Sequence, residues 1–184
     1  MKALINDRTR KYLITALMSA VIMILSPFSI TIPISPVPIS LSTLTIYLAS
    51  YILGSKYAAI STMLYVLLGI IGLPVFTGFT GGVAKVLGPT GGYIISYVFL
   101  AIIAGSVIEK NYNNKVICFL GMFLGTIVLY IVGSLWLAFV MSISFRAALF
   151  AGVIPFIPGD IVKMIVALFL GDRIRIILKK LNYL

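Results

Sequence analysis

The chain has 184 residues and a formal net charge of +10, with 61% of its residues hydrophobic and only 10% charged. A soluble domain keeps roughly a quarter of its residues charged, so this composition excludes a globular domain surrounded by water. The cations stand between apolar runs and not in one basic patch, which argues against nucleic acid as a partner. We therefore expect an all-α integral membrane protein in which residues 1–184 form a single membrane domain.

Six apolar runs, separated by proline, glycine and charged residues, predict six transmembrane helices. A spanning helix needs about 20 apolar residues, so the second run is expected to be tilted or only partly spanning. The first run is long enough to span and has no clear small-residue cleavage site, so it is interpreted as a helix and not as a signal peptide. Residues 145–154 are expected to form a further short helix or the end of the fifth span. The predicted helices are approximately residues 12–29, 41–53, 57–72, 91–108, 116–141 and 159–178.

The basic residues predict how these helices are oriented. Cytoplasmic loops carry an excess of Lys and Arg, and with a cytoplasmic N-terminus the predicted outer loops hold only Lys85 and Arg146. Both termini are then expected on the cytoplasmic side, in agreement with an even number of spans. The basic residues of the predicted inner segments are Lys2, Arg8, Arg10, Lys11, Lys56, Lys110, Lys115, Arg173, Arg175, Lys179 and Lys180.

Two of the predicted outer connections have an unusual composition. Residues 31–40 contain Pro33, Pro36 and Pro38, and proline excludes a regular helix, so a stiff extended strap over the outer face is expected. Residues 72–93 are rich in glycine but also apolar. Non-helical backbone at membrane depth is tolerated only where protein buries it or where it lines a cavity. This Gly-rich loop is therefore expected either to line a ligand site or to be a plain flexible loop.

The side chains needed for catalysis or metal binding are scarce. The chain has no histidine, one cysteine and four acidic residues, so no carboxylate pair, metal-ligand cluster or nucleophile–histidine pair can be assembled. No metal, cofactor or enzymatic activity is therefore expected. The Gly-rich loop also lacks the G-x-x-x-x-G-K-[ST] pattern of a nucleotide site. Any ATP-driven transport would depend on an ATPase in another chain.

A pair of opposite charges stands near the start of the last predicted helix. Asp160 and Lys163 are three residues apart, so they share one face of a helix, and ionisable groups in such a place usually line a cavity or pair with one another. A ligand site is one interpretation. The other is structural, with Asp160 as the N-cap of the helix and Lys163 extending to the lipid headgroups.

Small residues at four-residue spacing occur in two predicted helices. Ala16 and Ala20 lie in the first, and Gly121 and Gly125 lie in the fifth. Such spacing lets helices approach closely in lipid. Each pair is expected either to pack inside the bundle or to form a partner interface.

Four motifs, in this order, resemble the BioY family, which is the biotin-specific substrate-binding (S) component of energy-coupling-factor (ECF) transporters. They are PVPISLSTL at residues 36–44, GIIGLPVF at 69–76, LGPTGGY at 87–93 and FIPGDIVK at 156–163. The resemblance covers nearly the whole chain. It implies a six-helix fold in a bacterial cell membrane with biotin bound near the outer surface. It also implies docking, through Ala16 and Ala20, to a transmembrane coupling protein that carries two ATP-binding-cassette ATPases.

The resemblance and the chemistry of biotin together suggest a set of binding residues. The ureido group offers two N–H donors and one carbonyl acceptor, which Asp160, Lys163 and nearby hydroxyls could meet, while aromatic rings pack on the fused rings. Lys163 is expected to bind either the ureido carbonyl or the carboxylate. Many family members have Gln where this chain has Ser42, so a water or another residue would take its place. The candidate binding residues are Asp160, Lys163, Thr43, Phe76, Phe79, Thr80 and Tyr93.

The expected function is therefore high-affinity capture of biotin at the outer face, followed by delivery through an ATP-driven partner module. Two alternatives remain at this point. A stand-alone facilitator of a small solute would support uptake when expressed alone. A structural or assembly protein of the membrane would bind no vitamin tightly.

Overall fold

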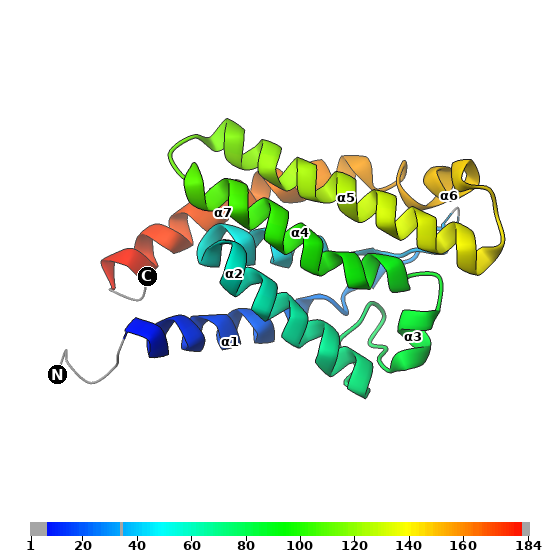
Figure 1. The fold of residues 1–184 in the computed structure, drawn as a ribbon, viewed down its shortest axis with the longest axis horizontal. Coiled ribbons are helices and arrows are strands. Elements are labelled where there is room, and N and C mark those ends of the chain that lie inside the picture. Colours follow the sequence, from blue (N-terminus) through cyan, green and yellow to red (C-terminus); the bar gives the residue numbers. More distant parts are fainter. Residues whose placement is uncertain (1–6, 34, 182–184) are drawn as a thin grey trace.

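The computed structural model describes residues 7–33 and 35–181, and helices make up most of this part of the chain (Figure 1). Lys2 of the predicted inner segments lies outside the described residues. Two short strands, β1 (Ser29–Ile30) and β2 (Ile39–Ser40), pair antiparallel. The helices are α1 (Asp7–Leu25), α2 (Ser42–Ile71), α3 (Val83–Leu87), α4 (Gly91–Lys110), α5 (Lys115–Met141), α6 (Phe145–Gly152) and α7 (Ile157–Lys180).

By length and composition, fewer helices qualify as membrane spans than the six predicted. In the described part of the chain α2, α4 and α5 qualify, and the pair α6 and α7, bent by 52° at a short break, makes up to four. α1 does not qualify, because Arg8, Arg10 and Lys11 lie at its start. α2 covers two of the predicted helices, residues 41–53 and 57–72.

Gly54 divides α2 into two segments. Its φ of 74° and ψ of −174° are not helical, and only glycine adopts this region without steric strain. The chain turns back there (Figure 1). Ser42 and Tyr65 would be about 35 Å apart along one straight helix, but both lie against Tyr97 of α4. α2 therefore consists of two helical segments, residues 42–53 and 55–71, and the second segment folds back along the first.

Small residues set the packing between neighbouring helices. α1 lies on the second segment of α2, where the Ser19 hydroxyl donates to Ser61 Oγ over 3.1 Å in a buried contact. Gly121 and Gly125 of α5 are buried against α4, where an added Cβ would come within 2.8 Å of Val107 or Leu100 side-chain atoms. This glycine pair therefore packs inside the bundle.

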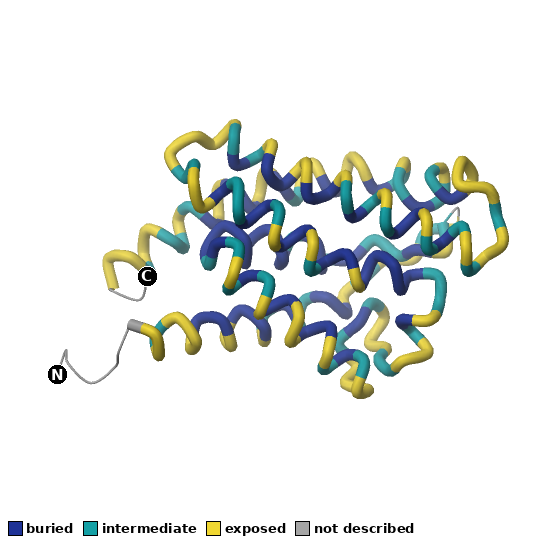
Figure 2. The backbone as a smooth tube through the Cα atoms, viewed as in Figure 1, coloured by how far each residue is buried: buried dark blue, intermediate teal, exposed yellow. Residues whose placement is uncertain are grey.

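The outer faces of the helices are largely apolar. Figure 2 shows the buried residues on the inner faces of the helices and the exposed residues on the outer faces. Exposed side chains on these faces include Leu17, Leu135, Phe139, Val162 and Phe169. A surface of this kind is stable in lipid and not in water, so it belongs in the bilayer.

The Pro-rich and Gly-rich segments have local structures of their own. The Pro-rich segment joins β1 to β2 and contains no helix in its described residues. The Gly-rich segment folds back on itself through a bridge between Phe76 and Thr80, and its Gly82 N–H donates to Gly69 O over 2.7 Å. Within the stretch 145–154, residues 145–152 form the separate short helix α6, because α5 ends at Met141 and Ser142 is left-handed, with a φ of 52°.

Candidate functional site

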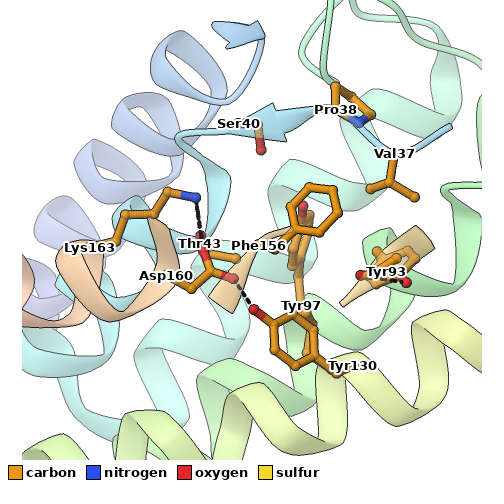
Figure 3. Close-up of a pocket in the computed structure, with 12 residues that line it drawn as sticks. Val37, Pro38, Ser40, Thr43, Tyr93, Tyr97, Tyr130, Phe156, Asp160 and Lys163 are labelled. Atoms are coloured by element: carbon orange, nitrogen blue, oxygen red, sulfur yellow. Dashed lines mark hydrogen bonds and ion pairs between the residues drawn. The ribbon is translucent and has the colours of Figure 1, made fainter. Parts of the chain in front are cut away.

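A small cavity of about 40 Å³ lies at the end of the bundle away from the start of α1 and the end of α7 (Figures 1 and 3). It is bounded by the starts of α2, α4 and α7, by α5, by the end of α6 and by the Pro-rich segment. Its lining residues are Val37, Pro38, Ser40, Thr43, Tyr93, Tyr97, Leu129, Tyr130, Gly152, Phe156, Asp160 and Lys163.

The Asp160 carboxylate is the centre of the hydrogen bonds in this cavity (Figure 3). Its Oδ1 accepts from the Thr43 hydroxyl and from Lys163 Nζ, each over 2.9 Å, and its Oδ2 accepts from the Tyr130 hydroxyl over 2.7 Å. Lys163 Nζ also donates to Thr43 Oγ1 over 3.1 Å. Asp160 is only 4% exposed. Three donors from α2, α5 and α7 thus compensate the cost of burying this charge.

Asp160 is not the N-cap of its helix, which corrects the structural alternative considered above. α7 begins at Ile157, the N-cap is Phe156, and the Asp160 N–H donates to Phe156 O over 2.9 Å as a helical residue does. Lys163 does not extend to the surface either, because its side chain is 13% exposed and its ammonium group turns back to Asp160. The pair therefore faces the cavity.

Tyr93 reaches the cavity because of the two glycines before it. A Cβ at Gly92 would collide with Trp136 of α5, so the glycine lets α4 begin in close contact with that helix. The Tyr93 hydroxyl donates to Gly152 O over 3.0 Å, at the end of α6. This bond fixes the ring against the cavity.

A second cavity of about 20 Å³ lies beside the first. The two share Val37, Pro38, Tyr93 and Tyr97 as lining residues. Thr77, which lines only the second cavity, has a buried Oγ1 with no hydrogen-bond partner in the described part of the chain. Together the cavities form a narrow space under the Pro-rich segment, with an ion pair at one end and neutral hydroxyls at the other.

The predicted site residues separate into two groups. Asp160, Lys163, Thr43 and Tyr93 come together at the cavity.

Phe76, Phe79 and Thr80 do not line this cavity. Phe76 is fully buried under Gly69, with its ring 5.5 Å from that of Tyr65. Phe79 is 60% exposed and packs on Phe28, and the Thr80 hydroxyl donates to Thr77 O. The Gly-rich segment closes on itself, so it presents Thr77 to the cavities in place of these three residues.

Three aromatic residues that line the cavity were not predicted from the sequence: Tyr97, Tyr130 and Phe156. Tyr97 follows Tyr93 by four residues and so shares its helix face, a signal that was available. Tyr130 is a hydroxyl-bearing residue deep in an apolar helix, where such a group needs a partner.

Ser42, where many family members have Gln, is fully buried and does not line the cavity. Its Oγ accepts from the Ser40 hydroxyl over 3.0 Å, and Ser40 does line the cavity. The neighbouring serine thus presents a hydroxyl in this part of the wall.

Metal binding finds no support in the described residues, where no three His, Cys, Asp or Glu side chains gather. The cavity instead offers one acid, one base, five neutral hydroxyl-bearing residues and aromatic rings. Such a set suits a neutral, ring-shaped ligand with both hydrogen-bond donors and acceptors.

Comparisons with known proteins show which family the chain belongs to. The family model described as the BioY family matches residues 1–180. The "Probable biotin transporter BioY" of Pyrococcus horikoshii is 40% identical over 146 residues, which are 79% of this chain and 85% of that protein. The "Biotin transporter BioY" of Lactococcus lactis subsp. cremoris is 37% identical over 179 residues, 92% of this chain and 93% of that protein.

A solved structure has the same fold. It is described as the "Crystal structure at 2.1 A of the S-component for biotin from an ECF-type ABC transporter", and it superimposes with a TM-score of 0.86 at 36% sequence identity. The match covers 94% of this chain and 95% of that one. The chain is therefore a multi-pass membrane protein, and it belongs to the BioY family.

Proposed function

We propose that this chain is the biotin-binding subunit of an ECF-type importer, which captures biotin and delivers it through an ATP-driven partner module. The observation that carries the proposal is the Asp160 carboxylate, held by Thr43, Lys163 and Tyr130 at the end of an aromatic cavity. Membership of a family whose named relatives are biotin transporters gives this cavity its ligand.

In the proposed pose the ureido group of biotin lies at the Asp160 end. One of its N–H groups donates to the carboxylate, and the carbonyl beside it accepts from Lys163. The biotin carboxylate lies at the other end, near Thr77, because two anions beside a single cation would repel one another. The fused rings pack between Tyr93 and Phe156.

Binding in this pose requires the cavity to enlarge. Ligand pockets commonly measure roughly 300–1,000 Å³, and the two cavities together are far smaller. The Pro-rich segment contributes Val37 and Pro38 to both and is held to the bundle by few hydrogen bonds, so we expect it to move as biotin enters.

The proposed topology has six spans with both termini in the cytoplasm. The spans are α1, the two segments of α2, α4, α5 and the bent pair of α6 and α7, and the first segment of α2, residues 42–53, crosses only part of the bilayer. Support comes from the turn of α2 at Gly54 and from the gathering of Lys and Arg at the end of the bundle where α1 begins and α7 ends (Figure 1). The cavity then faces the outside of the cell membrane.

Docking to the coupling protein and its two ATPases is assigned to α1. Ala16 and Ala20 are exposed on the outer face of this helix, so their small side chains would let a partner helix approach closely. Replacing either alanine by tryptophan is expected to abolish ATP-driven uptake and to leave biotin affinity unchanged. Leu135→Trp, at an exposed position on α5, is the matched control. A biotin flux by this chain alone would favour the facilitator instead.

The first experiment is calorimetric titration of biotin into the purified, biotin-depleted protein in detergent. Wild type is expected to bind one biotin tightly, and Asp160→Asn and Lys163→Ala are expected to weaken binding by about 100-fold or more, because each loses a charged hydrogen-bond partner. Asp172→Asn is the matched control, since Asp172 pairs with Lys115 at the other end of the bundle. A well-folded wild type that binds no biotin would contradict the proposal. If both site variants bind biotin as tightly as wild type, biotin remains the ligand but Asp160 and Lys163 do not belong to its binding site.

A further inference from the structure

The end of the bundle opposite the biotin site holds a larger cavity, of about 470 Å³. It lies where the start of α1, the Gly54 turn of α2 and the ends of α4 and α7 meet (Figure 1). Cations predominate in its lining and come from three different helices. The charged lining residues are Lys11, Lys110, Arg175, Lys179 and Glu109.

The positive charge of this cavity is only partly offset by carboxylates. Among its described lining residues Glu109 carries one negative charge against four cations, and its Oε2 accepts the Ser55 N–H over 2.8 Å at the start of the second segment of α2. In residues 7–33 and 35–181 none of the four cations lies within ion-pair distance of a carboxylate. Lys11 and Lys179 instead lie about 6 Å from the rings of Tyr57 and Tyr112. The charge is thus available to an anion that enters the cavity.

Arg175 is held in place by the break in α2. Its Nη1 donates to Ile52 O over 3.1 Å and to Tyr51 O over 3.4 Å, carbonyls that end the first segment and have lost their helical donors at Gly54. Its guanidinium group also lies 3.2 Å from the ring centroid of Tyr112. A cation fixed in this way loses little side-chain entropy when it binds an anion.

We propose that this cavity binds the phosphate headgroup of an anionic phospholipid. Arg and Lys side chains are suited to phosphate, and basic pockets between membrane helices commonly take anionic headgroups. Tyr57, Tyr112, Ile52 and Leu53 also line the cavity, which gives the lipid glycerol and upper acyl chains an apolar and aromatic surface. A small soluble phosphate would leave that surface unused. The proposal is independent of what binds at Asp160.

The test uses the full-length protein in a neutral detergent, with thermal unfolding and native mass spectrometry as the two measurements. Phosphatidylglycerol is expected to raise the unfolding temperature and to stay bound, whereas the zwitterionic phosphatidylcholine does neither. The double variant Lys110→Gln/Lys179→Gln is expected to bind phosphatidylglycerol roughly 30-fold more weakly, because each basic residue near an anionic headgroup contributes about a factor of five. Both lysines are exposed, so the variant should fold.

The matched control is Arg173→Gln/Lys180→Gln, which removes the same charge from the same end of the bundle but outside the cavity. It is expected to keep wild-type lipid affinity, and all variants are expected to bind biotin normally. Equal losses in the two double variants, or equal binding of the two lipids, would overturn the proposal. Competition by glycerol 3-phosphate would assign the cavity to a soluble phosphate. Absence of lipid binding combined with weaker assembly on the coupling protein would assign it to an acidic partner surface.

Discussion

An acid and a base meet at one end of the bundle, and at the other end an acid and a base are kept apart. At the proposed biotin site Asp160 and Lys163 are in contact, 2.9 Å apart and mostly buried. At the break in α2, Glu109 accepts the N–H that opens the second segment, and Arg175 donates to the carbonyls that close the first. Glu109 thus satisfies the free N–H on one side of the break, and Arg175 satisfies the free carbonyls on the other side.

The two arrangements leave different residual charges. The contact pair cancels its own charge, so we expect the proposed biotin site to recognise its ligand by hydrogen bonds and shape. The separated pair complements the partial charges at two helix ends, and in the described part of the chain the lysines that line the cavity around it have no carboxylate within ion-pair distance. The same residue types thus make a site for a neutral ring at one end and a cationic cavity at the other.

Removing the acid of the contact pair should have the largest effect. Asp160→Ala leaves the Lys163 ammonium group buried without its counter-charge, so the free energy of unfolding should fall by about 3–5 kcal/mol. Asp172→Ala, which breaks the more exposed pair with Lys115, should cost less than about 1 kcal/mol. Unfolding in mixed micelles measures both. Similar losses would mean that burial does not distinguish the two pairs.

The second-largest loss of stability is expected from a side chain added at Gly54, in the turn between Glu109 and Arg175. In Gly54→Ala the new Cβ would lie 2.6 Å from Glu109 Oε2 and the backbone would keep a φ of 74°, so a loss of about 2 kcal/mol in unfolding free energy is expected. Biotin affinity should stay within about threefold of wild type. Gly159→Ala, where a Cβ meets no atom within 4 Å, serves as the control. An unchanged melting temperature for Gly54→Ala would show that the turn carries no strain.

The hydroxyl of Tyr130 tests the biotin site without removing a charge. Tyr130→Phe deletes the bond to Asp160 Oδ2, so biotin should bind about tenfold more weakly, as expected for a hydrogen bond to a charged group. Tyr47→Phe deletes a buried bond to Thr126 outside the cavity and should lower stability without changing biotin affinity. If both variants bind biotin equally well, Tyr130 belongs to the scaffold.

The smallest effect is expected from Glu109→Gln. The amide oxygen can still accept the Ser55 N–H, so only the charge next to a helix N-terminus is lost, which contributes about 0.3–1 kcal/mol. Chemical denaturation of the variant beside Glu109→Ala separates the charge from the hydrogen bond. Equal stability of the two variants would show that the hydrogen bond contributes nothing.

Spacing along the sequence predicted those site residues that lie close together on a single helix. Asp160 and Lys163 were identified because three-residue spacing places side chains on one helix face whatever the tertiary structure. Tyr130 was missed because its role depends on a partner 30 residues away. Phe76, Phe79 and Thr80 were selected because their loop is glycine-rich, but the bridge between residues 76 and 80 decides which side chains face the cavity, and composition does not predict that bridge.

The fold shows the same division. The helix ranges follow from hydrophobic runs, and the break near residue 54 follows from Gly-Ser-Lys between two such runs. The number of spans does not follow from length alone, because a 30-residue helix can either cross the bilayer once or turn back within it. Contacts with α4 and α7 decide between these outcomes.

The turn at Gly54 also bears on how the protein is made. The two residues that satisfy its free backbone groups, Glu109 and Arg175, are synthesised 54 and more than 120 positions after the groups they bind. The segment 42–53 is too short to span a bilayer by itself. When it leaves the ribosome, neither partner has been synthesised. The side-chain hydrogen bonds of this turn can therefore be completed only after α4 and α7 have been made.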